Sequence, residues 1–315
     1  LDRAGGSPLQ RARLHTQLGM VLGAVGQRDE ALALLDESEA AIATQLGPGS
    51  TGLVPTLNVR GTVYEGRRDV DRALADYARA LAICEAHLSP DHPDVAAIFN
   101  NMALIEEHHE RYDKARAHLE RALEIRRRSL GAEHPLVGTT RMNLGSLLLM
   151  TGDSDGAITQ FEQALAVLTR AQGADADIAD IFYNLGIAYQ ARGELEQARE
   201  RYQDALTRSE LLHGPTSAEV AYPLLGLGEV LVELGRDAEA RAALDRALAI
   251  RTREGVEPVD LGELRFAFAR ALTTVDRDRA VMLAQQARED YARDGAQDHV
   301  QDIDTWLKGQ VKRRD

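Results

Sequence analysis

Residues 184–198 read NLGIAYQARGELEQA, and the small residue near the start of this stretch recurs along the whole chain. Gly186 has a counterpart every 41 or 42 residues. The full set is Gly19, Gly61, Ala103, Gly145, Gly186, Gly228 and Ala269. A fixed period of about 20 to 50 residues is typical of stacked repeat architectures, so the sequence predicts an array of similar units.

Each period carries two helical patterns. In the fifth unit, apolar residues from Phe182 to Tyr189 follow the spacing of one helix face, and a second stripe runs from Leu195 to Leu206 after Gly193. Each unit is therefore predicted to be a helix pair. The small residue lets the two helices approach closely, and a large residue of the second helix is expected to fill the space beside the next unit. These large residues are Leu35, Tyr77, Leu119, Phe161, Tyr202 and Leu244.

The pattern N-L-G-x-x-Y-x-x-x-G-x-x-x-x-A, from Asn184 to Ala198, resembles the tetratricopeptide repeat, and the likeness covers nearly the whole chain. The long period, with His-Pro linkers at residues 88–95 and 130–137, is similar to the kinesin light chain type. The last unit, Leu261 to Tyr291 with Trp306-Leu307, resembles the C-terminal region of bacterial serine/threonine kinases. The resemblance implies an all-α, right-handed α-α superhelix whose concave face, formed by the first helix of each pair, holds peptide ligands.

The repeat positions also divide the chain. We expect residues 1–11 to form a linker or N-terminal extension, and residues 12–293 to form seven repeats of about 42 residues. Residues 294–315 are predicted to form a capping helix and a basic tail. Val300, Ile303, Leu307 and Val311 would lie on one face of this helix, which would cover the apolar end of the array.

Charge and composition exclude several classes of protein. The chain has 50 acidic against 37 basic residues, a net charge of −13, and one cysteine, Cys84, which cannot form an internal disulfide. An acidic chain is a poor nucleic-acid binder, because that role needs concentrated Lys and Arg. The longest apolar stretch, residues 144–150, is too short to span a membrane, so we expect no direct membrane insertion. We expect a cytoplasmic location, or an extracytoplasmic one if a membrane span in a longer parent protein precedes the repeats.

The chain contains motifs that resemble catalytic or metal sites but lack the context that such sites need. Gly47 to Gly52 fits G-x-G-x-x-G, but it follows a predicted helix rather than a strand, so an inter-repeat loop is the expected interpretation. Glu106 and His109 form one E-x-x-H pair without the second pair of a carboxylate-bridged centre. No P-loop, zinc-protease, hydrolase or kinase signature is present in the sequence. We therefore expect no enzyme activity, metal or cofactor in these residues.

Two further features are predicted to be structural. His92 and His134 each precede a proline, which disfavours helix at the histidine and would set the entry into the next repeat. The basic runs at residues 126–128 and 312–314 are expected to be solvated helix ends, where positive charge favours the helix dipole.

Asparagines mark the predicted groove. Asn101, Asn143 and Asn184 lie two residues before the small residue of their units, and Asn58 and Asn100 lie three before theirs. An amide carries donors and an acceptor, so such a column can bind an extended peptide backbone. Related peptide-binding repeats place asparagine at the matching offset for this purpose. The alternative is that these amides bond neighbouring helices and stiffen the array.

The residues that flank the asparagines bear on the ligand. Thr62, Glu65 and Glu107 are neutral or acidic, as are Asp180 and Glu229, so a clamp for a C-terminal carboxylate is disfavoured. Arg13 and Arg141 are the only basic residues expected in the groove. Arg141 stands where the family has a large apolar side chain, so it points either inward or into the groove.

These features together predict a non-catalytic scaffold that binds a protein or an extended peptide of neutral to basic character. The scaffold would be the sensory or recruiting part of a bacterial signalling protein such as a serine/threonine kinase. One alternative is a self-association module that forms a homo-oligomer. Another is the regulatory half of a larger enzyme whose kinase or protease effector lies outside these residues.

Overall fold

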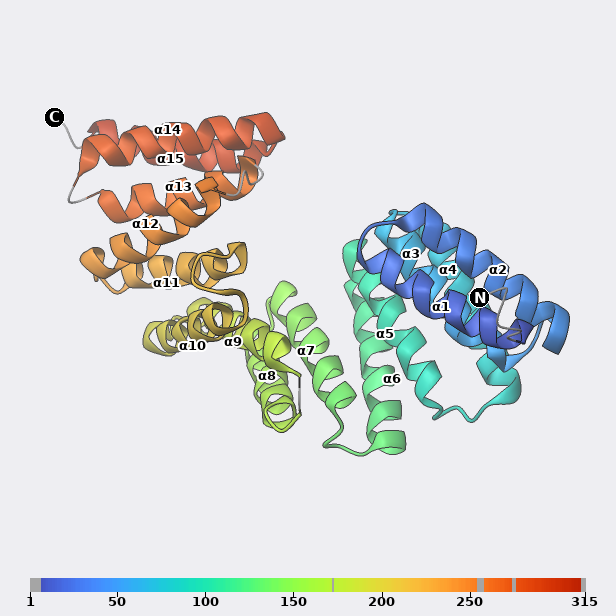
Figure 1. Ribbon diagram of the computed structural model, residues 1–315. Helices are drawn as coiled ribbons and strands as arrows, with labels where there is room; N and C mark the ends of the chain where they lie inside the picture. The colour runs from blue at the N-terminus through green and yellow to red at the C-terminus, as the bar shows by residue number, and fades with distance from the viewer. Residues whose placement is uncertain (1–6, 172, 254–257, 274–275, 313–315) are drawn as a thin grey trace. The chain divides into compact units, whose positions relative to one another are not determined.

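The computed structural model describes residues 7–171, 173–253, 258–273 and 276–312, and within these ranges the chain is all helix and loop, without strands. It divides into two compact units, residues 1–147 and 148–315. Residues 313–315 of the predicted basic tail lie outside the described residues. Figure 1 shows the helices in chain order. They are α1 (Pro8–Ala24), α2 (Arg28–Leu46), α3 (Val54–Gly66), α4 (Val70–His87), α5 (Pro93–His108), α6 (Tyr112–Leu130), α7 (Pro135–Met150), α8 (Ser154–Leu168), α9 (Asp175–Ala191), α10 (Leu195–His213), α11 (Ala221–Glu233), α12 (Asp237–Arg253), α13 (Pro258–Leu272), α14 (Arg277–Asp294) and α15 (Gln297–Lys312).

The helices pack as consecutive pairs, as the repeat predicts. In unit 1, α1 packs on α2, α3 on α4 and α5 on α6, and the first helices α1, α3 and α5 lie side by side (Figure 1). In unit 2, the same arrangement holds for α9 with α10, α11 with α12 and α13 with α14, and α8 packs on α9. The predicted all-α fold of packed helix pairs with a C-terminal capping helix is confirmed within each unit. Short 3-10 turns, at Thr51–Leu53 and Ala218–Val220, precede α3 and α11.

Close packing between the helices of a pair explains the recurring small residue. A Cβ added at Gly61 would lie 2.6 Å from the ring of Tyr77, and one added at Gly186 would lie 2.6 Å from the ring of Tyr202. Tyr77 and Tyr202 therefore pack on the small residue of their own repeat, as Leu35 does on Gly19 and Leu244 on Gly228. Tyr202 also reaches the next repeat, where a Cβ at Gly226 would lie 2.5 Å from its ring. The prediction that these large residues fill the space beside the next unit is thus incomplete, since they also pack within their own repeat.

The helix cap at the C-terminus is α15. Its Val300 and Ile303 are buried in the core of unit 2, and the Trp306 ring meets the Phe266 ring edge to face at 5.8 Å. The opposite side of the helix carries exposed Asp302 and Lys308. The side chain of Val311, predicted to lie on the same face as Ile303, is outside the described residues.

The first helix begins earlier than the repeat positions predict. Residues 1–11 are predicted to be a linker or N-terminal extension, with the repeats beginning at residue 12, but α1 begins at Pro8. Ser7 accepts a hydrogen bond from the backbone of Gln10, whose side chain accepts one from the backbone of Ser7, forming a capping box. Pro8 occupies the first turn, where its missing N–H costs little.

The two His-Pro linkers start helices, as expected. His92 is the N-cap of α5, and its Nδ1 accepts a hydrogen bond from the backbone of Asp94 at 3.2 Å. The Nδ1 of His134 accepts one from the backbone of Leu136, also at 3.2 Å. The imidazole thus caps the helix, and the following proline supplies its first residue.

One of the two basic runs, residues 126–128, is only partly exposed to solvent. Arg126 is buried, and its guanidinium donates to the carbonyl oxygen of Leu136 at 3.1 Å and to the hydroxyl of Thr140. Burial lowers the pKa of this guanidinium. The prediction was wrong for Arg126 because that residue lies on the face of α6 that meets the start of α7, whereas Arg127 and Arg128 are exposed.

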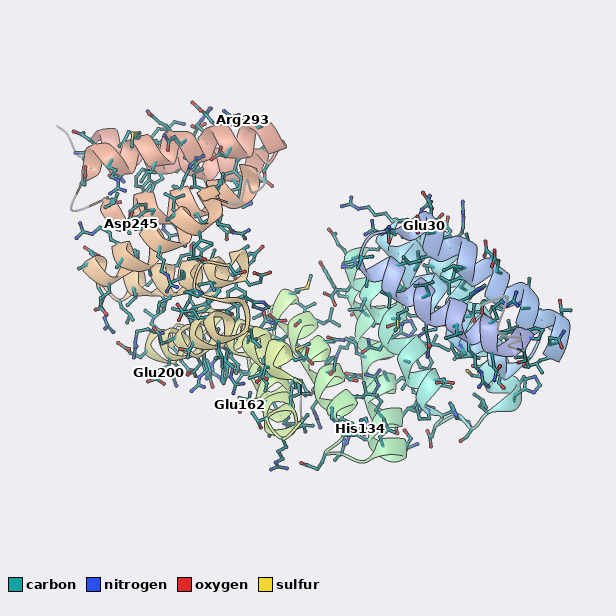
Figure 2. The ribbon with its side chains drawn as sticks, in the orientation of Figure 1. Glu30, His134, Glu162, Glu200, Asp245 and Arg293 are labelled. Carbon is teal, nitrogen blue, oxygen red and sulfur yellow. The ribbon has the colours of Figure 1, made fainter. Side chains whose placement is uncertain are left out.

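Charged side chains cover the outer surfaces of both units. Glu30, Glu200 and Arg293 are exposed and are among the labelled side chains of Figure 2. None of the helices in the described ranges is long and apolar enough to cross a membrane.

Candidate functional site

A groove of about 1050 Å³ lies in unit 1 among the first helices of three successive repeats. α1 contributes Met20, α3 contributes Val59 and Val63, and α5 contributes Leu104 and Ile105. These apolar side chains make a surface that can pack against a ligand's side chains or backbone. A concave, largely apolar site with a few polar groups is the usual form of a binding site.

The polar groups in this groove include three of the predicted site residues. The Asn101 Nδ2 donates to the Asn58 Oδ1 at 3.0 Å, which joins α5 to α3. Thr62 is exposed and lies 3.1 Å from the Tyr77 hydroxyl. The Asn58 Nδ2 makes no hydrogen bond to any residue that the structure describes. Asn58, Thr62 and Asn101 therefore come together on one surface, with amide hydrogens still available for a ligand.

Charges lie at one end of the groove. The Glu65 carboxylate is 3.5 Å from the Nδ1 of His108, and both residues line the groove. Burial raises the pKa of Glu65, and the adjacent imidazole of His108 partly offsets this effect. Arg28 and Arg68 also line the groove, so its charge is mixed rather than uniformly acidic.

The remaining predicted residues lie outside this groove. Asn100 is buried, and its Oδ1 accepts a hydrogen bond from the Asn143 Nδ2 at 3.1 Å, joining α5 to α7 within unit 1. Glu107 is half-buried, and burial raises its pKa. Arg141 is half-buried on α7, where burial and the nearby Arg127 lower its pKa. Asn184 is half-buried on α9 in unit 2.

Four of the asparagines thus bond neighbouring helices in two pairs, Asn58 with Asn101 and Asn100 with Asn143, as the alternative interpretation has it. Each pair joins residues 43 apart, one more than the repeat period, because the first amide lies three residues before the small residue of its repeat and the second lies two before that of the next. The two roles are compatible in the groove, where one Asn58–Asn101 bond leaves other amide hydrogens exposed to a ligand. The Asn100–Asn143 pair is the same bond one repeat further along.

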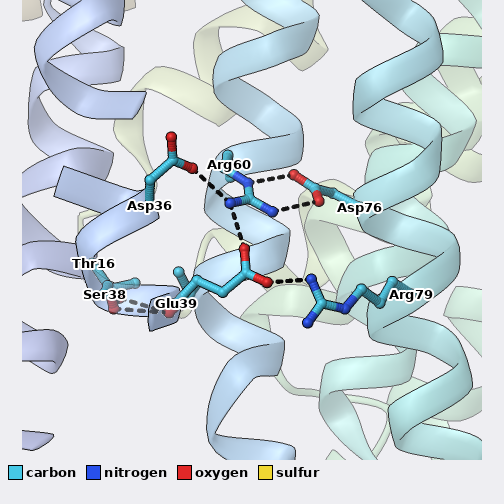
Figure 3. Close-up of polar contacts among 8 residues, drawn as sticks. Thr16, Asp36, Ser38, Glu39, Arg60, Asp76 and Arg79 are labelled. Carbon is cyan, nitrogen blue, oxygen red and sulfur yellow. Dashed lines mark hydrogen bonds and ion pairs between the residues drawn. The ribbon is translucent and has the colours of Figure 1, made fainter. Parts of the chain in front are cut away.

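A buried ionic network beside the groove was missed by the sequence analysis. Arg60 of α3 donates two hydrogen bonds to Asp76 of α4, at 2.7 and 2.8 Å, and one to Asp36 of α2 at 2.7 Å (Figure 3). Glu39 of α2 lies 2.5 Å from the same guanidinium and also pairs with Arg79. The sequence held a signal, since the position of Arg60 is leucine in four other repeats, at Leu18, Leu144, Leu185 and Leu227.

The possible metal ligands do not assemble. Glu106 is buried and pairs with Arg111 at 2.5 Å, while His109 is exposed at the end of α5. Among the described residues, no three His, Cys, Asp or Glu side chains are placed to share a metal ion.

Comparisons with known proteins agree on one repeat type. Residues 10–86, 94–170 and 177–253 match a family profile described as Tetratricopeptide repeat, and residues 58–129 match a second profile with the same description. These matches span well over half of the chain. No curated protein sequence matches it.

Solved structures share the fold at low identity. BtubC (BKLC) from P. vanneervenii is 22% identical, with a TM-score of 0.62, over 76% of this chain and 92% of that one. The TPR-like repeats of a putative kinesin light chain from Podosopora anserina are 22% identical, with a TM-score of 0.54, over 66% and 98%. A Signal Transduction ATPase with Numerous Domains (STAND) protein with a tetratricopeptide repeat sensor, from Pyrococcus horikoshii, is 14% identical, with a TM-score of 0.72, over 92% and 43%.

Proposed function

Because this chain belongs to the tetratricopeptide repeat family, we propose that it is a protein-binding scaffold without catalytic activity of its own. An extended peptide segment lies in the groove of unit 1, across α3 and α5. The observation that carries this proposal is the groove itself, in which an apolar surface borders the amides of Asn58 and Asn101. An extended peptide needs both kinds of contact, since its backbone seeks hydrogen bonds while its side chains seek apolar surface.

The charge of the partner follows from that of the groove and of the chain. The chain carries a net charge of −13, which favours encounter with a neutral or basic partner. The half-buried Glu65 carboxylate has His108 beside it, and it can accept a hydrogen bond from a cationic side chain of the peptide. Arg28 and Arg68 at the rim argue against a strongly basic ligand.

We place this scaffold in a longer signalling protein, as its sensory or recruiting part. The STAND protein of similar fold carries a tetratricopeptide repeat sensor, and this chain covers 43% of it, which supports the arrangement of repeats beside another domain. The resemblance to the C-terminal region of serine/threonine kinases stays a prediction, as does the cytoplasmic location.

The groove asparagines test the proposal. We expect the double change Asn58→Ala with Asn101→Ala to weaken binding of a selected peptide by about 1 to 3 kcal/mol, because peptide polar groups lose their partners in a desolvated contact. Peptides would be selected from a random library displayed against the full chain, and their affinity would be measured by fluorescence anisotropy.

The chain offers a matched control for this change. Asn100→Ala with Asn143→Ala removes the same kind of amide pair one repeat away, outside the groove lining. It should leave the affinity unchanged within about twofold, since both partners of the bond are removed together and neither meets the peptide. Equal loss of binding in both double variants would contradict a site in this groove, as would full affinity in the Asn58/Asn101 variant.

A further inference from the structure

Two arginines at one end of the groove of unit 1 have no anionic partner. Arg28, at the start of α2, and Arg68, in the turn between α3 and α4, both line the groove and are exposed. Neither guanidinium makes a hydrogen bond or an ion pair with any residue that the structure describes. These two cations are therefore available to an anion that the chain itself does not supply.

The carboxylates closest to these arginines in the sequence are already paired. Asp29 forms an ion pair with Arg67. Asp69 forms one with Arg72, at 3.0 Å. The carboxylate of Glu65, the acidic residue of the groove, faces a histidine at 3.5 Å instead of an arginine. The neighbouring acidic side chains thus neutralise other groups, and the two groove arginines keep their positive charge.

Arg28 lies over the second repeat, because a glycine there makes room for it. A Cβ added at Gly66 would lie 2.9 Å from the Nε of Arg28, so this guanidinium packs against the end of α3. Every other repeat has a side chain at the position of Gly66. These residues are Ala24, His108, Met150, Ala191, Glu233 and Thr274. The contact directs the charge of Arg28 toward the turn that carries Arg68, two residues beyond Gly66.

Arg68 occupies a backbone conformation that the repeat otherwise gives to glycine. Its φ of 61° is in the left-handed region, where a Cβ is crowded by the backbone and costs free energy. The matching residues of four other repeats are glycines with φ of 71° to 84°, namely Gly26, Gly152, Gly193 and Gly235. No hydrogen bond or ion pair of the Arg68 side chain within the described residues offsets this cost. Strain of this kind is typical of ligand-binding positions.

We propose that Arg68 and Arg28 bind the carboxylate of an Asp or Glu side chain in the peptide that occupies this groove. The inference rests on the proposed function, since it concerns the ligand of the same groove. Guanidinium groups hold carboxylates through charge-assisted hydrogen bonds, and a second guanidinium beside the first strengthens the attraction. The peptide therefore carries an acidic residue at the end of the groove where α3 turns into α4.

The position of the two arginines favours a side-chain carboxylate over the C-terminus of the peptide. A C-terminal carboxylate belongs to the backbone, so it would lie beside the amides of Asn58 and Asn101, which bind the backbone. The cations lie at the turn instead. A side-chain carboxylate extends away from the backbone and can reach that turn. The peptide can still be neutral overall, because Glu65 accepts a cationic side chain in the same groove.

The first experiment selects random displayed peptides against the full parent chain. The selected peptides should share an Asp or Glu, and changing it to the corresponding amide should weaken binding by about 10-fold. The same change should matter by less than about twofold with the Arg68→Gly variant, because the charged partner is absent. Selection against Arg68→Glu should yield Lys or Arg at the same peptide position, since the charge of the site is reversed.

Arg68→Gly also separates binding from stability. Glycine adopts the left-handed conformation without strain, so this variant should unfold at a temperature about 2 to 4 °C higher while its affinity for the parent-selected peptides falls about 10-fold. Glu110→Gly is the matched control, since Glu110 has φ of 57° at the same turn of the third repeat but does not line the groove. It should stabilise the chain similarly and leave the affinity unchanged within about twofold. Arg28→Ala repeats the binding test if circular dichroism shows that Arg68→Gly is unfolded.

The outcomes distinguish this inference from the proposed function. Loss of binding on amidation of the peptide's C-terminus would assign the site to a terminal carboxylate and overturn the side-chain assignment. The inference also fails if peptides that depend on Asn58 and Asn101 share no acidic residue, or bind Arg68→Gly and Arg28→Ala as tightly as the parent; the groove itself would then stand. Failure to select any peptide, or peptides that bind independently of those asparagines, would overturn both.

Discussion

Replacing Arg60 with alanine is expected to lower the free energy of unfolding of unit 1 by about 3 to 5 kcal/mol. Arg60 and Asp76 are both buried, and the guanidinium holds this carboxylate through two hydrogen bonds while it also pairs with Asp36 and Glu39. The variant leaves the buried Asp76 carboxylate without a counter-charge, which costs far more than the loss of one contact. Native-state hydrogen exchange of the α3 and α4 amides would measure the effect.

Two controls separate this network from ordinary surface charge. Arg79→Ala removes the more exposed arginine that pairs with Glu39, and it should cost only about 0 to 1 kcal/mol. The double change Arg60→Leu with Asp76→Leu should recover much of the stability lost in Arg60→Ala, because a buried ion pair can be replaced by apolar residues. A single Arg60→Ala variant as stable as the parent would show that the network does not hold unit 1 together.

Acid should weaken the same network. Burial raises the pKa of Glu39, but the guanidinium groups of Arg79 and Arg60 outweigh it and hold this pKa below its ordinary value. A carboxyl whose pKa is lowered on folding contributes stability above its ordinary pKa and loses that contribution as the pH falls through the folded value. The difference between the parent and Arg60→Ala should therefore shrink in acid.

Deleting residues 297–315 is expected to expose the apolar side of the last helix pair and to cause aggregation. Val300 and Ile303 are buried in the core of unit 2, and their burial alone contributes about 3 to 6 kcal/mol as an upper estimate. Without α15, the amides of α13 and α14 should exchange faster, and light scattering should detect association through the uncovered surface.

Point changes in α15 distinguish the cap from a general effect of shortening the chain. Ile303→Asp should reproduce most of the loss of protection, because it places a charge in the core. Asp302→Ala changes the residue just before Ile303, which is exposed, and should alter stability by no more than about 0.5 kcal/mol. Unchanged exchange in α13 and α14 after the deletion would mean that α15 does not cap unit 2.

The features that a single repeat determines could be predicted from the sequence. The small residue that lets the two helices of a pair approach closely, such as Gly61, was predicted because it recurs in every period, whereas its contact with the large residue of its own repeat, such as Tyr77, was not. The start of α1 was missed because the repeat positions alone set the expected boundary, although Ser7 and Gln10 have the spacing of a capping box and Pro8 follows the N-cap. Local capping chemistry therefore locates a helix start better than the period does.

The features that depend on contacts between repeats could not be predicted in the same way. The offset of Asn58, Asn100, Asn101 and Asn143 is visible in the sequence, but their pairing depends on the register of adjacent first helices. Arg126 likewise needs the start of the following repeat to show that its charge is buried against the Leu136 carbonyl. Of the residues predicted for the groove, Asn58, Thr62, Glu65 and Asn101 line it and the others do not, because its walls come from three helices that are far apart in the chain.

Hydrogen exchange with bound peptide tests the central claim, that unit 1 holds an extended peptide in its groove. The full chain would be labelled with and without a peptide selected from the displayed library, and amide protection would be followed by mass spectrometry. We predict new protection in α3 and α5, whose residues Asn58, Thr62 and Asn101 line the groove, and its loss in the Asn58/Asn101 double variant. Protection confined to unit 2 or to α2, α4 and α6 would contradict the account.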